Sequence, residues 1–245
     1  MSNQLSNLVK ICQQNLKNSA DCLNYLNERG INEELINLYK IGYFPQSVNT
    51  LGKYISLDYL REKSIIKINN DSDFKNYHYL IIPILNEYGN TVGISGRTLL
   101  DSDQIKILNL PKYRNSSYSK KDILFGLNNS IEDIIEKKSV WVVEGYFDQI
   151  AMYKNGIKNV VALGGTAFSR NHFLRLKRFC NRINFLLDND EAGHLTSRRI
   201  HKKFNKYSSE LKFYTLKKHK DVDEFLSNND KRLLKQNIAK LDVWG

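Results

Sequence analysis

The chain has 245 residues, of which 41% are hydrophobic and 26% are charged, and its formal net charge is +11. This length is enough for one large domain or two small ones, and the composition is that of an ordinary globular protein. No apolar run approaches the length of a membrane span, and the polar start at residues 1–4 is unlike a signal peptide. We therefore expect a cytoplasmic protein that has no contact with a membrane.

The three cysteines, Cys12, Cys22 and Cys180, are far apart, and no Cys-x-x-Cys or Cys/His cluster occurs. This spacing excludes a disulfide framework and a structural zinc site, so we expect three reduced thiols and no zinc.

The first 45 residues are predicted to form helices. Apolar residues recur every three or four positions from Leu5 to Leu16, which is typical of one face of a helix. A second helix is expected from Cys22 to Arg29, and a third should begin after the N-cap residue Asn32 and end before Gly42.

A β-rich part follows the helices. Two apolar runs, 79–85 and 91–97, flank a turn at 86–90 that contains Gly89-Asn90, which predicts a β-hairpin. Residues 111–122 are polar and rich in Lys, Ser and Asn, so this segment is predicted to be a loop.

From Val140 onward, short apolar runs alternate with helical segments, which is typical of a parallel α/β sheet. The predicted strands cover 140–143, 160–163, 183–187 and 211–216. We place a soft boundary near residue 135, which gives a first domain over 1–135 and a second over 136–245, with a helical tail at its C-terminal end.

Acidic residues follow three of these strands. They form the pairs Glu144 and Asp148, Asp188 and Asp190, and Asp221 and Asp223. In an open α/β sheet, ligands bind at the carboxyl ends of the strands. Carboxylates gathered there repel one another unless cations hold them. Hard oxygen ligands suit Mg²⁺, and two such ions can activate an attacking hydroxyl and stabilise a leaving oxygen. The alternative is that each acid is only a helix N-cap, but three pairs after three strands favour a metal site.

The positive charge is concentrated around the second acidic pair. Residues 170–220 contain fourteen Lys and Arg against four Asp and Glu, so this segment carries nearly all of the net charge. The alternative interpretation is a solvated helix face. A basic surface beside an acidic metal site is what a protein that binds a phosphate polymer needs, so we favour nucleic acid as the partner.

Four segments together resemble the Toprim domain, a metal-binding fold of primases, topoisomerases and some nucleases. They are Glu144-Gly145-Tyr146-Phe147-Asp148, Leu163-Gly164-Gly165-Thr166, Asp188-Asn189-Asp190-Glu191-Ala192-Gly193 and Asp221-Val222-Asp223. The resemblance implies a Toprim-type parallel sheet flanked by helices, joined to a smaller α+β N-terminal subdomain. Asn189 stands where the family often has glycine, and Val222 where proline is usual. Neither departure removes a carboxylate.

The upstream half narrows the resemblance to the catalytic core of bacterial DnaG-type DNA primases. The segments that carry it are 25–31, 83–84, 93–97, 111–116 and 124–127. The resemblance implies an enzyme, a nucleotidyltransferase that makes short RNA primers from ribonucleoside triphosphates on single-stranded DNA during replication. The resemblance covers about residues 20–230. It also implies that the protein is located in the cytoplasm of a bacterium or of a phage-infected host cell.

Site residues follow from this resemblance. Glu144, Asp188 and Asp190 match the catalytic metal ligands, with Mg²⁺ as the ion and Mn²⁺ as an alternative. Glu144 also matches a group that assists the 3′-hydroxyl by acid–base chemistry. Asp148, Asp221 and Asp223 match supporting acids of the same cluster. Arg97, Lys112, Asn115 and Lys120 match a basic ridge that faces nucleotide and template.

Primases of this family typically carry a zinc-binding domain that reads the template and a helical domain that docks on the replicative helicase. The present sequence has no zinc ligands for the first of these domains and is too short to include the second. These absences favour a compact phage-type version. A separate zinc-binding protein that reads the template, a helicase contact through residues 1–45, or relaxed sequence selectivity would each fit these absences. The competing hypotheses are a Toprim nuclease or topoisomerase-like subunit and a non-catalytic nucleic-acid-binding module of a replisome.

Overall fold

The computed structural model describes residues 4–207, 210–229 and 231–243. It divides the chain into two compact units, which consist of 1–85 with 89–118, and 86–88 with 119–245. The boundary expected near residue 135 falls inside helix α8 (Leu127–Lys137), which packs on two strands of the second unit. The division into domains 1–135 and 136–245 remains a prediction. The outer ends of these domains, 1–3 and 244–245, lie outside the described residues.

The first unit begins with the expected helices. Ser19 and Asn32 cap the second and third of them by accepting hydrogen bonds from backbone N–H groups. Shorter helices occupy the stretch before the hairpin and the connection after it. The helices of this unit are α1 (Gln4–Asn15), η1 (Leu16–Asn18), α2 (Ala20–Glu28), α3 (Glu33–Tyr39), α4 (Val48–Leu51), α5 (Leu57–Glu62), α6 (Asp73–Asn76) and α7 (Ser102–Ile107).

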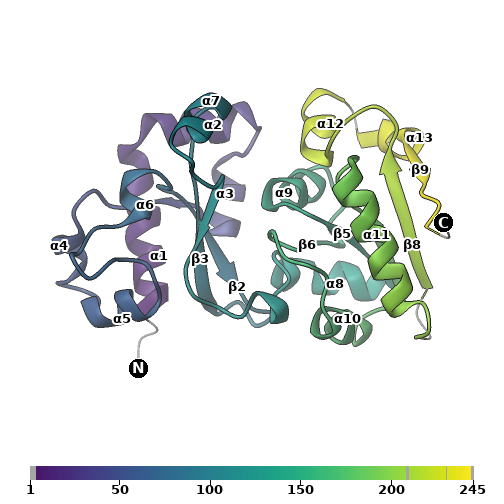
Figure 1. Cartoon of the computed structure of the whole chain (residues 1–245), viewed down its shortest axis with the longest axis horizontal. Helices are drawn as coiled ribbons and strands as arrows, with labels where there is room; N and C mark the ends of the chain where they lie inside the picture. Colours follow the sequence, from purple (N-terminus) through teal and green to yellow (C-terminus); the bar gives the residue numbers. More distant parts are fainter. Residues whose placement is uncertain (1–3, 208–209, 230, 244–245) are drawn as a thin grey trace. The chain divides into compact units, whose positions relative to one another are not determined.

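The first unit also contains an antiparallel sheet in the order β1-β2-β3-β4. Figure 1 labels its two long strands, β2 and β3. The predicted hairpin is confirmed as β2 (Leu80–Leu85) and β3 (Thr91–Arg97), and β1 (Gly42–Tyr43) pairs with β2. The loop prediction for 111–122 is wrong in part, because β4 (Tyr113–Asn115) pairs with β3 and a 3-10 helix, η2 (Lys120–Asp122), follows. The three residues of β4 have no apolar pattern, and they form a strand because they pair with β3.

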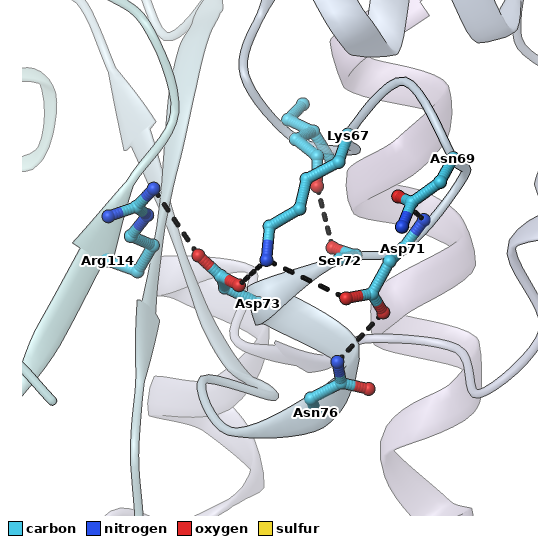
Figure 2. A network of polar contacts seen from close by, with 8 residues as sticks. Lys67, Asn69, Asp71, Ser72, Asp73, Asn76 and Arg114 are labelled. Carbon is cyan, nitrogen blue, oxygen red and sulfur yellow. Dashed lines mark hydrogen bonds and ion pairs between the residues drawn. The ribbon is translucent and has the colours of Figure 1, made fainter. Parts of the chain in front are cut away.

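Charges of opposite sign surround the start of α6. Lys67 Nζ lies 2.6 Å from Asp73 Oδ1, and Arg114 Nη2 lies 3.3 Å from Asp73 Oδ2 (Figure 2). Lys67 also lies 3.7 Å from Asp71, whose carboxylate accepts a hydrogen bond from Asn76. Each carboxylate of this network therefore has a cation beside it.

The second unit contains a sheet in the order β6-β5-β7-β8-β9. Four strands are parallel, as expected, and they are β5 (Ser139–Val143), β6 (Val160–Ala162), β7 (Arg182–Leu186) and β8 (Glu210–Leu216). Helices follow residue 221 as expected, but the chain then forms β9 (Ile238–Lys240), which the sequence did not indicate and which pairs antiparallel with β8 at the edge of the sheet.

Helices follow the strands of this sheet in the order expected from the sequence, and α11 runs alongside β8 (Figure 1). Phe185, Phe213 and Phe204 pack in the core between sheet and helices. None of the helices in the described ranges is long and apolar enough to cross a bilayer. The remaining helices are α9 (Tyr146–Lys154), α10 (Arg170–Lys177), α11 (Glu191–Phe204), α12 (Val222–Asn228), η3 (Lys231–Leu233) and α13 (Leu234–Asn237).

Candidate metal centre

The three acidic pairs follow β5, β7 and β8, which are neighbours in the sheet. Because these strands are parallel, their carboxyl ends meet at one edge, and the connections that carry the acids start from that edge. The four-residue connection between β7 and α11 (residues 187–190) is short enough to keep both of its acids there.

Glu144 and Asp188 are in contact across the first two connections. The backbone N–H of Asp188 donates to Glu144 Oε1 at 3.2 Å. Burial raises the pKa of the half-buried Glu144 carboxyl, and the charge of Asp190 raises it further, whereas the Asp188 N–H and Lys220 act in the opposite direction. The Glu144 carboxylate is therefore held at the β7 end by a backbone donor.

Asp148 is the buried member of the group, with only 8% of its surface exposed. Its Oδ2 accepts a hydrogen bond from Gly145 N at 3.0 Å, and its Oδ1 accepts one from Asp223 N at 3.1 Å. Burial, followed by the charge of Asp221, raises the pKa of Asp148 to about 7. A Cβ at Gly145 would lie 2.7 Å from Asp148 Oδ2, so the glycine permits this close approach.

Asp188 lies among other carboxylates. Burial raises its pKa to about 6, and the charges of Glu144, Asp221 and Asp190 add to the rise in that order. Lys220 lowers it. The carboxylates of the three connections therefore lie close enough for their charges to repel one another.

Asp190 and Asp221 are also helix N-caps. Asp190 Oδ1 accepts from Gly193 N at 2.9 Å at the start of α11, and Asp221 Oδ1 accepts from Glu224 N at 2.8 Å at the start of α12. The capping alternative raised from the sequence is thus correct for these two acids. It does not exclude a metal role, because capping fixes the two carboxylates at the edge where the other acids lie.

The donor set suits a hard divalent cation, since every member is a carboxylate. In the described part of the chain, no group of three or more His, Cys, Asp or Glu side chains is arranged so that it could hold a metal ion. Mg²⁺ does not require such a cage, because it usually keeps several waters and binds one or two carboxylates together with substrate phosphate. The residues therefore fit a hydrated divalent cation that binds to one or two carboxylates and keeps several of its waters.

A surface cavity of about 470 Å³ adjoins the acids at the start of α11. Besides Asn189 and Asp190, its lining includes His194 and Arg198. Arg198 is exposed and follows Asp190 by two turns of the helix. The cavity is thus lined by the acidic N-cap residue of α11 and by a cationic side chain of the same helix.

The predicted basic ridge is divided between the two units. The first unit holds Arg97 at the end of β3, Lys112 just before β4 and Asn115 at the end of β4. Lys120 on η2 belongs to the second unit. The Arg97 guanidinium lies over two aromatic rings, 5.0 Å from the Tyr25 centroid and 5.2 Å from that of Tyr113. Packing between the rings leaves Arg97 only 8% exposed. Lys112 is exposed.

Two residues of the site did not follow from the sequence pattern. Lys220, the residue before Asp221, has its charge close enough to Glu144 and Asp188 to lower both pKa values. The only feature of the sequence that could have indicated this role is that Lys220 is next to an acid of the cluster. Asn189 joins two of the acidic connections through hydrogen bonds, and its only signal was that it departs from the glycine often found there.

The region with the parallel strands and the acids matches the family model described as Toprim-like, over residues 141–226. Residues 11–131 match the model of the DNA primase catalytic core, N-terminal domain. The chain therefore belongs to the DnaG-type DNA primase family, as a catalytic core with both of these domains.

Similar proteins agree with this assignment. The DNA primase of Borreliella burgdorferi is 32% identical over 201 residues, which are 79% of this chain and 38% of the relative. The Aquifex aeolicus primase, solved with its zinc-binding and RNA polymerase domains, is 27% identical with a TM-score of 0.81 over 95% of this chain and 59% of that chain. A DnaG primase catalytic domain bound to single-stranded DNA is 25% identical with a TM-score of 0.79, over 95% and 78% of the two chains. The chain thus spans well under half of its curated relative's length.

Proposed function

We propose that the chain is a primase core that joins ribonucleotides into short RNA primers on single-stranded DNA, by metal-dependent nucleotidyl transfer during replication. The observation that carries the proposal is the edge where β5, β7 and β8 bring repelling carboxylates together. Burial and mutual repulsion raise the pKa of Glu144, Asp148 and Asp188. A divalent cation relieves that repulsion, and the related proteins are DNA primases.

In this proposal Glu144, Asp188 and Asp190 bind Mg²⁺, for which Mn²⁺ can substitute. When bound, the ion lowers the pKa of the primer 3′-hydroxyl and neutralises charge on the triphosphate. Glu144 can take the hydroxyl proton, because burial makes its carboxylate a better base than an exposed one. Asp148, Asp221 and Asp223 support the cluster from α9 and α12.

The proposed nucleotide and template contacts are made by the basic ridge. Arg97 is held by two tyrosine rings, so little side-chain entropy is lost when it binds a phosphate. Lys112, Asn115 and Lys120 supply further contacts. The exposed basic residues of α11, including Arg198, can bind the phosphate backbone of the polymer.

The proposed substrates are ribonucleoside triphosphates and a single-stranded DNA template. The related A. aeolicus chain was solved with a zinc-binding domain. We propose that a zinc-binding protein reads the template for the present core and that a replicative helicase recruits it.

The test is primer synthesis from ribonucleoside triphosphates on single-stranded DNA with Mg²⁺. We expect short RNA products that disappear in Asp190→Ala, while DNA binding persists. The matched control is Asp58→Ala, whose carboxylate is exposed in the first unit, and it should leave the products unchanged.

Absence of RNA with Mg²⁺ or Mn²⁺, with and without helicase, would overturn the proposal. Metal-dependent nicking of plasmid DNA would instead indicate a nuclease or topoisomerase-like subunit. DNA binding that weakens with salt but ignores metal would indicate a non-catalytic replisome module.

A further inference from the structure

Asn189 lies between two acids, but its side chain points to a different part of the site. Its Oδ1 accepts a hydrogen bond from Thr215 Oγ1 at 2.8 Å, and its Nδ2 donates to the carbonyl oxygen of His219 at 3.3 Å. The Asn189 backbone N–H donates to the carbonyl oxygen of Lys220 at 2.7 Å. All three partners belong to β8 or to the connection that leads to Asp221.

These bonds join two acid-bearing segments that have no covalent link nearby. One is the β7–α11 connection with Asp188 and Asp190, and the other is the β8–α12 connection with Asp221. Two of the three bonds need the Asn189 side chain. A third residue extends the network, because His194 Nε2 on α11 lies 3.4 Å from Thr215 Oγ1.

We propose that Asn189 is a positioning residue, which holds the connection of Asp188 and Asp190 against that of Asp221 and so keeps the metal-binding carboxylates together before the ion arrives. The proposal rests on the proposed function for the identity of the site. It assigns a role to a position where glycine, which has no side chain, cannot make the same bonds.

The physical reason is that charges of one sign push the two connections apart when no cation is present. With the Asn189 side chain, part of the cost of gathering the acids is already met by hydrogen bonds within the fold. Without it, only the backbone bond to Lys220 remains, and the ion must gather the acids itself. The metal affinity falls, whereas the reaction at saturating metal changes little.

The experiment measures the rise in thermal stability as a function of Mg²⁺, without nucleotide or DNA, and the Mg²⁺ midpoint is the dissociation constant fitted to that rise. In Asn189→Ala we expect this midpoint to rise about tenfold, which corresponds to the loss of one to two hydrogen bonds. Thr215→Val removes the donor to Asn189 Oδ1, so its midpoint should rise less. The double variant should resemble Asn189→Ala, because both substitutions break one network.

Asn155→Ala is the matched control. Asn155 Nδ2 donates to the carbonyl oxygen of Ala151 at 2.9 Å in the same unit, so this variant also loses an amide-to-carbonyl bond. It should lower the melting temperature without moving the Mg²⁺ midpoint. If Asn189→Ala does not fold, Thr215→Val decides the question.

A second readout is primer synthesis as a function of Mg²⁺, in which Asn189→Ala should need about tenfold more metal and reach nearly the same maximal rate. An unchanged midpoint in Asn189→Ala, or an equal rise in Asn155→Ala, overturns the proposal. A wild-type chain that responds to Mg²⁺ but makes no primers refutes the proposed function alone, and the thermal midpoints still test Asn189. A wild-type chain without any Mg²⁺ response refutes the role of Asn189 as well.

Discussion

The two units differ in the charges that surround their aspartates, which are cations in the first unit and carboxylates in the second. In the first unit, Asp71 has Lys67 beside it, and its pKa is lowered by the hydrogen bond from Asn76 and by nearby cations (Figure 2). In the second unit, Asp148 and Asp188 lie among carboxylates, and burial and repulsion raise their pKa values. Both arrangements use the same residue type at the start of a helix or at the end of a strand.

This difference separates a structural network from a candidate active site. A carboxylate with a cation beside it adds to stability, whereas repelling carboxylates subtract from it and persist only where they have another use. Four predictions test this difference between the units.

The largest effect is expected for Asp188→Asn. Removing one of the proposed metal ligands should reduce primer synthesis by about 100-fold or more. In the absence of metal, the same variant should be more stable than the wild type near pH 8, because it removes a partly buried charge from repelling neighbours. The measurements are primer yield and thermal unfolding in EDTA. A variant that loses activity and also loses stability in EDTA would show that Asp188 is structural, like the acids of the first unit.

The pH dependence of unfolding should be large and should have the sign set by Asp148. Its pKa is about 7 in the folded chain and near the ordinary 3.8 in the unfolded chain. Between these values the folded chain keeps a proton that the unfolded chain has lost. Stability in EDTA should therefore fall as the pH rises from about 4 to about 7, by a few kcal/mol at most, and the penalty is complete above pH 7.

The control for this pH dependence is Asp148→Asn. The variant should be less stable than the wild type at pH 5, because an amide cannot accept from both Gly145 N and Asp223 N. Its stability should nevertheless vary less with pH. Excess Mg²⁺ should restore the wild type most strongly near pH 8, and thermal unfolding at a series of pH values measures all of these effects. A wild-type profile that rises from pH 4 to pH 7 would contradict the assignment.

A third prediction compares two glycines. A Cβ at Gly193 would lie 2.1 Å from the carbonyl oxygen of Asp188, so Gly193→Ala must displace the connection that carries the acids. We expect a loss of about 1–3 kcal/mol in the free energy of unfolding and weaker binding of Mg²⁺. Gly52→Ala in the first unit meets neighbours no closer than 3.4 Å and should change stability by about 0.5 kcal/mol or less. Equal effects in the two variants would show that the acidic connection is not tightly packed.

The sequence predicted the elements that depend on local pattern. The hairpin of β2 and β3, the four parallel strands and the helices after them were found from apolar periodicity and turn residues. The gathering of the acids was also predictable, because neighbouring parallel strands end at one edge. The strands β4 and β9 were not predicted, since each has three residues and is stabilised by pairing with a longer strand.

The surroundings of individual side chains were the part that sequence could not supply. The pattern placed Asp148 and Asp190 in one group, yet one is buried between two backbone donors and the other is an exposed N-cap. Burial and hydrogen-bond partners depend on how helices pack across the sheet. For the same reason, the bonds of Asn189 to β8 could not be inferred from its neighbours in the chain.

The smallest effect is expected for Asp73→Asn in the first unit. Asp73 is 23% exposed in its side chain and accepts contacts from Lys67 and Arg114 (Figure 2). Replacing it leaves two partly exposed cations beside each other, which should cost about 1 kcal/mol or less, and the cost should shrink at high salt.

Denaturant unfolding at two salt concentrations measures this cost, with Asp58→Asn as a control because the Asp58 side chain is 91% exposed beside Arg61. The sign is opposite to that expected for Asp188→Asn in EDTA, and Mg²⁺ should bind to Asp73→Asn as it does to the wild type. If Asp73→Asn instead stabilised the chain, or moved the Mg²⁺ midpoint, the paired and the repelling carboxylates would not differ in the way that their surroundings indicate.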